Sequence, residues 1–153
     1  KAAIGLREFM RFTKAEDYGL YGVLYLAEQD NGRVVPLSEV SREQDVPEKF
    51  LAKIFQSLSK AGIVKSHRGV KGEFTLARAP EDITVRELVE TIQGPYFLAK
   101  CIHDHRECDK SANCPVRHLL KLTLTCILDQ FQKYTLADML KWKQNPELIS
   151  DLK

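Results

Sequence analysis

Apolar residues recur at helical spacing in the first third of the chain, and polar breaks divide them into separate segments. Thr13 and Glu16 have the spacing of a capping box, so we expect a helix to begin there and to continue through the apolar run that follows. The dipeptide Asn31-Gly32 interrupts this run. A short second helix is then predicted over residues 36–44, in which two apolar side chains face inward, namely Leu37 and Val40.

The next periodic pattern predicts a third helix over residues 47–60. Its apolar residues fall on one face, which we expect to pack on the first two helices: Phe50, Leu51, Ile54, Phe55 and Leu58. The opposite face is polar and basic, with Lys49, Lys53 and Gln56. A helix built in this way fits the major groove of DNA, which is about 12 Å wide. The pattern therefore favours a recognition helix.

Two short strand-like runs follow, over residues 63–67 and 74–77. Gly62 is expected to end the third helix, and the segment 68–72 has glycines that permit a turn and cations that protrude. Three helices and a hairpin in this order are typical of a winged helix-turn-helix domain. The predicted fold class is therefore mainly α with a small β-hairpin wing, joined to a long dimerisation helix.

The second half of the chain opens with the capping-box spacing of Thr84 and Glu87, which predicts a helix as far as Ile92. After a cysteine-containing loop, apolar residues recur at helical spacing from Pro115 to Tyr134. A helix of about 20 residues extends about 30 Å, which is more than a small wing domain covers. We therefore expect homodimerisation through this helix, with an ordinary core helix as the alternative.

Cys126 lies among the apolar residues of this long helix and is interpreted as a buried small hydrophobe. A further capping signature, Thr135 with Asp138, opens the last predicted helix. The expected organisation has five parts: a short extension or cloning remnant (1–9), the winged helix-turn-helix domain (10–94), a cysteine loop (95–114), the dimerisation helix and return helix (115–140) and a polar tail (141–153).

Charge is segregated along the chain, although the net charge of its 153 residues is only +2. Residues 47–78 carry seven lysines and arginines against two glutamates, a balance of +5, so the remainder sums to −3. The cations fall on the outer face of the third helix and at the hairpin tip, which favours DNA binding over a merely solvated basic face. No apolar run approaches the roughly 18 residues of a membrane span, so we expect a soluble, cytoplasmic protein without a membrane partner.

Three cysteines lie in one short polar stretch that lacks the apolar residues to form a core of its own: Cys101, Cys108 and Cys114. A disulfide is disfavoured because nothing resembles a secretory signal and one thiol would stay unpaired. Spacings of six and five residues suit an iron-sulfur cluster. Zinc completed by a histidine (His103, His105 or His118) and unliganded thiols remain alternatives. A thiol-redox enzyme is disfavoured, since no Cys-x-x-Cys is present.

Four motifs together resemble one family: Met10-Arg-Phe-Thr, the third-helix sequence from Phe50 to Val64, Arg68-Gly-Val-Lys-Gly in the wing, and Thr135-Leu-Ala-Asp-Met-Leu. The chain resembles the winged-helix iron-sulfur regulators that include IscR, NsrR and CymR. This resemblance implies a homodimeric transcription factor, not an enzyme, acting as a repressor on a partly palindromic operator in double-stranded DNA. Lys49, Lys53 and Arg68 match positions that contact DNA in this family. The full set of predicted DNA-binding residues is Lys49, Lys53, His67, Arg68 and Lys71.

The resemblance also implies that Cys101, Cys108 and Cys114 hold a 2Fe-2S or 4Fe-4S cluster, with Asp17 as the fourth ligand, from the first helix of the other subunit. His118 is the alternative fourth ligand, one residue beyond the position at which IscR-like members carry a histidine. Such a regulator would sense iron status, nitric oxide or redox state. The alternative is a regulator without a cluster, or with zinc, that is controlled by a partner protein or a metabolite.

Overall fold

The protein is seen here in a computed structural model that describes residues 12–29, 32–67, 72–104, 106, 108–109 and 111–152. Its elements follow in the order α1 (Lys14–Glu28), β1 (Val35–Pro36), α2 (Leu37–Gln44), α3 (Glu48–Lys60), β2 (Val64–His67), β3 (Glu73–Leu76), the 3₁₀ turn η1 (Pro80–Asp82), α4 (Val85–Gln93), α5 (Lys100–His103), η3 (Ser111–Asn113), α6 (Pro115–Lys133), α7 (Leu136–Gln144) and η4 (Pro146–Leu152).

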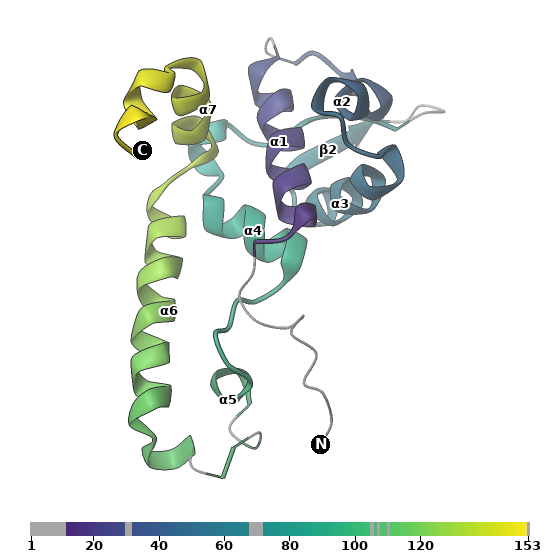
Figure 1. Ribbon diagram of the computed structural model, residues 1–153. Helices are drawn as coiled ribbons and strands as arrows, with labels where there is room; N and C mark the ends of the chain where they lie inside the picture. Colours follow the sequence, from purple (N-terminus) through teal and green to yellow (C-terminus); the bar gives the residue numbers. More distant parts are fainter. Residues whose placement is uncertain are drawn as a thin grey trace.

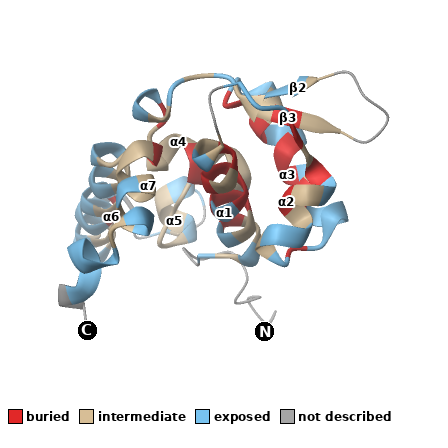
Figure 2. Ribbon diagram, turned by 90° about the horizontal axis from the view of Figure 1, so that it is seen from above, coloured by how far each residue is buried: buried red, intermediate tan, exposed pale blue. Residues whose placement is uncertain are grey.

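The elements form a winged-helix body and a long arm. Helices α1, α2 and α3 pack with the small sheet and form the body. Helix α6 extends away from the body, and the segment around α5 lies beside the end of α6 that is distant from the body (Figure 1). Burial follows this division, because buried residues concentrate in α1, α2, α3 and the sheet, and α6 is mostly exposed (Figure 2). The predicted fold class, mainly helical with a small β wing, is confirmed.

The sheet has three antiparallel strands in the order β1-β3-β2. The wing hairpin pairs β2 with β3, as predicted, with Val64 opposite Leu76. The two-residue strand β1 was not predicted; it pairs Val35 with Phe74 and places β3 in the centre of the sheet. A strand of two residues directly before a helix is too short to show an alternating apolar pattern. Strand β1 forms because β3 is available to pair with it.

The body is closed by a core in which α3 is the central helix. Leu51, Phe55 and Leu58 are completely buried, and the Phe55 ring meets the Phe74 ring edge-on at 5.0 Å between centroids. The sequence-based placement of Phe50 in this core is wrong, because its side chain is 58% exposed. Successive residues of a helix are rotated by about 100° around its axis, so Phe50 lies at the edge of the buried face that contains Leu51, and not within it.

The helix ends follow their capping signals closely. Thr13 and Thr135 each close a complete capping box, and the Thr84 hydroxyl accepts a hydrogen bond from the Glu87 N–H. At the end of α3, Gly62 has φ of +71°, and the hydrogen bonds of a Schellman motif follow it, from Gly62 N–H to Ser59 O and from Ile63 N–H to Leu58 O. Local sequence therefore sets where these helices begin and end.

Backbone hydrogen bonds join the start of α4 to the start of α7. Thr84 and Thr135 form an antiparallel bridge, flanked by Val85 N–H donating to Tyr134 O at 2.9 Å and Leu136 N–H donating to Ile83 O at 2.8 Å. The body end of α6 is therefore fixed to the winged-helix body by main-chain bonds and by the Tyr96–Phe131 ring contact.

Two details of the second half differ from the sequence-based expectation. Cys126 is exposed in this chain, so its interpretation as a buried hydrophobe is wrong; α6 touches the body along one side only, and Cys126 is on another. The region expected to be a polar tail contains the 3₁₀ turns of η4, and Ile149 packs beside α7. No helix within the described residues is long and apolar enough to span a membrane.

Candidate DNA-binding face and cysteine segment

The outer face of α3 is basic and open. Lys49, Lys53, Gln56 and Lys60 are all exposed, while the opposite face of the same helix is buried. Successive members of this set lie three or four residues apart, so they form one row along the helix. This row is the arrangement that a helix needs in order to place cations and an amide against DNA.

The wing carries the other predicted DNA-binding residues, of which the structure describes only one. His67, at the end of β2, is half-buried, and its Nε2 lies 2.9 Å from the Thr75 hydroxyl on β3. Arg68 and Lys71 lie outside the described residues. Arg78, counted in the basic segment, has a structural role: its guanidinium binds Glu87 and donates to the carbonyls of Gly62 and Asp82, both at 3.2 Å.

A second charged cluster lies where α2 meets α1. The Glu39 carboxylate accepts a hydrogen bond from the Tyr25 hydroxyl at 2.7 Å and a two-pronged pair from Arg33, both at 2.9 Å. The Tyr25 hydrogen bond, followed by the Arg33 hydrogen bond, lowers the pKa of Glu39 below its usual range, and the same bond to Glu39 raises the pKa of Tyr25. This cluster holds the first turn of α2 against α1 and leaves α3 free to face solvent.

The cysteine segment lies beside the end of α6 that is distant from the body (Figure 1). Cys101 is in α5, Cys108 is in the following loop and Cys114 is the N-cap residue of α6. All three are half-buried free thiols. The Cys114 sulfur accepts a hydrogen bond from the Arg117 N–H at 3.5 Å, and Arg117 Nε donates to the Cys101 carbonyl at 2.9 Å. Arg117 thus links two of the three thiol-bearing positions.

The predicted ligands do not converge within one described chain. Among the described residues, no three cysteine, histidine, aspartate or glutamate side chains are gathered in a way that could hold a metal ion. Asp17 is on the first turn of α1, on the body, whereas the cysteines are at the far end of α6. His118 is exposed in the first turn of α6, close in sequence to Cys114. His105 lies outside the described residues.

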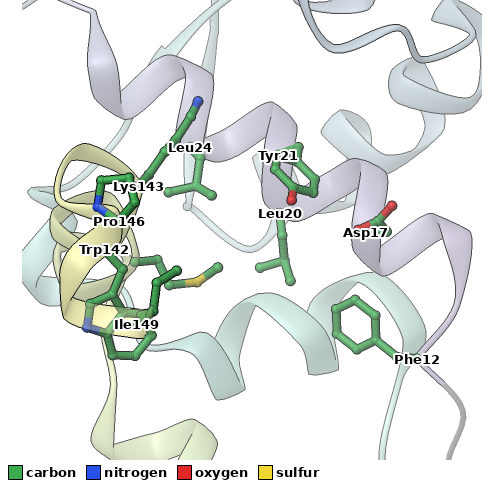
Figure 3. Close-up of a pocket in the computed structure, with 10 residues that line it drawn as sticks. Phe12, Asp17, Leu20, Tyr21, Leu24, Trp142, Lys143, Pro146 and Ile149 are labelled. Carbon is green, nitrogen blue, oxygen red and sulfur yellow. The ribbon is translucent and has the colours of Figure 1, made fainter. Parts of the chain in front are cut away.

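Asp17 stands at the edge of an apolar cavity of about 460 Å³ between α1, α7 and η4 (Figure 3). Leu20, Tyr21 and Leu24 line it from α1, and residues of the return helix and the turn after it line the other side: Met139, Trp142, Lys143, Pro146 and Ile149. Phe12 lines the same cavity. This cavity was not predicted from the sequence, although the apolar residues within 141–153 were a signal for it.

The sequence profile of the Rrf2 family, described as an iron-dependent transcriptional regulator, matches residues 12–142. The matched segment includes nearly the whole described chain, from the first cap to the return helix. The chain belongs to the Rrf2 family. It is therefore a winged-helix transcriptional regulator and not an enzyme.

Three relatives show how far the Rrf2 likeness extends. The HTH-type transcriptional regulator NsrR of Bacillus licheniformis is 28% identical over 132 residues, which are 86% of this chain and 92% of that protein. The solved structure of T. potens IscR has a TM-score of 0.68 at 26% identity, over 86% of this chain and 87% of the other. CymR, the global cysteine regulator of B. subtilis, has a TM-score of 0.72 at 22% identity, over 88% and 98%, and shows the fold alone.

These matches confirm the predicted family, and with it the expectation of a DNA-binding regulator. They do not test which residues of this Rrf2 chain bind DNA or a cluster. Lys49, Lys53 and Asp17 therefore stay predictions, placed by the structure on exposed or accessible positions of α3 and α1.

Proposed function

We propose that this Rrf2 regulator acts as a homodimeric repressor of genes with a partly palindromic operator. We also propose that it responds to iron status, nitric oxide or redox state through an iron-sulfur cluster, 2Fe-2S or 4Fe-4S. The proposed ligands are Cys101, Cys108, Cys114 and Asp17. The observation that carries the proposal is the position of three free thiols at the end of a long helix whose apolar face is exposed.

The exposed face of α6 supports a homodimer. Val116 and Leu119 are each 61% exposed and Leu122 is 53% exposed, and Cys126 continues the same row three to four residues further on. Large apolar side chains that share one face of an exposed helix mark an interaction surface. A second copy of α6 presents the same row, so a twofold pairing covers both rows at once.

Substitution of Leu119 tests this dimer. Leu119→Asp places a charge in the centre of the apolar row, and we expect sedimentation equilibrium to show a markedly weaker dimer. Gln132→Asp is the matched control, because Gln132 is exposed on the same helix and points about 140° away from Leu119 around the helix axis. Equal dissociation constants for the two variants would rule out the row as the dimer interface.

The donor set supports a cluster. Thiolates are the soft ligands that iron-sulfur clusters take, and three of them come from one short segment at the protein surface. Cys114 is the N-cap residue of α6, and its sulfur accepts a hydrogen bond from the Arg117 N–H at 3.5 Å. When bound, the cluster would supply a site for oxidation or nitrosylation. The three cysteines and Asp17 would hold it, and loss of the cluster would leave the cysteine segment less ordered.

Within one chain, Asp17 lies on the body and the thiols lie at the far end of α6, so the fourth ligand is proposed to come from α1 of the other subunit. A carboxylate holds a cluster less firmly than a thiolate, which suits a sensor. The cavity edge beside Asp17 leaves its carboxylate accessible to a segment of a second subunit. The cluster would then join the cysteine segment of one subunit to the DNA-binding body of the other.

Metal analysis of anaerobically purified protein tests the cluster. We expect a brown protein with matched iron and acid-labile sulfide, and colour that bleaches in air or nitric oxide. Cys108→Ala should abolish the colour, and Asp17→Ala should weaken retention while the apo protein remains folded. Glu43→Ala, which removes an exposed carboxylate of α2, is the matched control. Loss of colour in His118→Ala but not in Asp17→Ala would transfer the fourth ligand to His118.

The alternative is a regulator without a cluster, or with zinc, controlled by a partner protein or a metabolite. The Arg117 hydrogen bonds to the Cys114 sulfur and the Cys101 carbonyl favour this alternative, because they hold two of the three cysteine positions without a metal. A colourless protein after anaerobic reconstitution with iron and sulfide would support it, and the zinc content of the same sample would separate its two forms.

Operator binding is tested by salt titration. The logarithm of the affinity should fall with the logarithm of the salt concentration by about 0.9 per phosphate neutralised. Lys53→Ala should make this slope shallower by about two in a dimer that loses one contact per subunit. Lys121→Ala, an exposed lysine of α6, is the control and should leave the slope unchanged. Equal slopes for both variants would remove Lys53 from the DNA contact.

A further inference from the structure

Phe50 is an aromatic side chain exposed on the helix proposed to enter DNA. It lies in the first turn of α3, is 58% exposed, and is adjacent to Leu51, which is completely buried. Exposed Phe12 and Tyr21 line the cavity beside α7, so they have apolar neighbours. The exposure of Phe50 is different, because it is directed out of the body on a helix whose solvent face is basic.

The position of Phe50 on α3 places it among the DNA-facing residues. It is one residue from Lys49 and three residues from Lys53, both exposed, and Ser57 continues its side of the helix seven residues on. The first turns of a recognition helix are the ones whose side chains meet base edges. Lys49 and Lys53 both lie on the solvent-facing side of Phe50, so a partner that reaches this ring also meets two cations, which suits a polyanion.

The chemistry of the major groove gives an exposed phenyl ring one specific partner. Base edges in this groove present hydrogen-bond donors and acceptors, which a phenyl ring cannot satisfy, and the C5-methyl group of thymine, with which it makes apolar contact. We propose that Phe50 is a specificity-determining residue that recognises a thymine methyl group in each operator half-site. This inference rests on the proposed operator binding and names one base that the operator contains.

Replacement of thymine by uracil tests the contact, since it removes the methyl group and leaves the hydrogen-bonding edge intact. The operator is first selected from random duplexes with the full-length, anaerobically purified protein, and each thymine is then replaced by deoxyuridine. Loss of one methyl contact should weaken wild-type binding about three- to fivefold per half-site. Replacement in both half-sites should weaken it by about tenfold or more.

Two variants make the assignment to Phe50 specific. Phe50→Ala should bind the thymine and uracil duplexes equally, whereas Lys53→Ala, with weaker binding overall, should keep the wild-type ratio between them. Alanine is a good helix former and Phe50 is exposed, so the fold is expected to survive, and circular dichroism of each variant checks this. The ratio of two affinities for one protein is also insensitive to partial unfolding.

A thymine position at which wild type discriminates and Phe50→Ala does not would support the proposal. Tight operator binding with no such position would overturn the role of Phe50 and leave operator binding intact. Failure to select any duplex would overturn both. A wild-type thymine preference that persists in Phe50→Ala would assign the methyl contact to another residue and would equally reject the proposal.

Discussion

Gly22 permits α1 to approach α3 closely, and its replacement by alanine gives a test of that packing. A Cβ atom added at Gly22 would lie 2.9 Å from Cε2 and 3.2 Å from Cζ of Phe55, and 3.4 Å from a Leu51 methyl. The Phe55 ring is completely buried and meets Phe74 edge-on, so a shift of this ring would disturb the packing of the core. We therefore expect Gly22→Ala to destabilise the protein.

The magnitude is the difference of two opposing effects. Alanine is more favourable than glycine in a helix interior by about 1 kcal/mol. Forcing a methyl group into a filled core costs about 1–3 kcal/mol. The free energy of unfolding should therefore fall by about 1 kcal/mol, with a range from zero to about 2. For a chain of this size, a loss of 1 kcal/mol lowers Tm by about 2–4 °C.

Urea denaturation of the apo protein at one fixed concentration measures this difference, because dimer formation and ligand binding both raise apparent stability. In a Phe55→Leu background the smaller side chain relieves the contact, so the cost of Gly22→Ala should shrink or reverse. An increase in stability of about 1 kcal/mol for Gly22→Ala in the wild-type background would mean that only helix propensity acts. The close approach of α1 and α3 would then be refuted.

Two further predictions concern the capping box of α7 and the Glu39 cluster. Thr135→Ala should lower the free energy of unfolding by about 1 kcal/mol, because it removes the hydroxyl oxygen that accepts a hydrogen bond from the Asp138 N–H. Thr125→Ala, on the exposed face of α6, is the control and should change the free energy of unfolding by less than about 0.5 kcal/mol. Urea denaturation measures both values. Because the pKa of Glu39 is lowered on folding, its contribution is present above the usual glutamate pKa of about 4.3 and is lost as pH falls through the lower folded value. Tyr25→Phe should therefore be less stable than wild type at neutral pH, and the difference should narrow below about pH 4; a constant difference would contradict this.

Much of the fold could be predicted from the sequence because its signals are local. Thr13, Thr84 and Thr135 mark three helix starts within the sequence itself, and Gly62 marks a helix end. These residues act through hydrogen bonds to backbone groups two to five positions away, so no knowledge of the tertiary structure is needed. The order of elements, and with it the winged-helix class, follows from them.

The sequence-based predictions were wrong or incomplete where tertiary contacts determine the structure. Strand β1 depends on a partner strand nearly forty residues further along the chain, and local pattern contains no trace of it. Phe50 and Cys126 are apolar residues with apolar neighbours in the sequence. Both are exposed because their helices pack on the body through a different face. The candidate ligands are a harder case, because Asp17 lies on the body and the cysteines lie at the far end of α6, and their proposed meeting needs a second subunit.

The connection of α6 to the body decides whether an event at the cysteine segment can reach DNA. Helix α6 has 19 residues and is therefore about 28 Å long. Its body end is fixed by the Thr84–Thr135 bridge and by the Tyr96–Phe131 contact, whereas its other end carries Cys114. A stiff helix fixed at one end converts a shift at the other end into a rotation, and in the proposed twofold dimer such a rotation would change the separation of the two α3 helices. Because half-site spacing on DNA is fixed at about one helical turn, even a small change in that separation would alter affinity for the proposed operator.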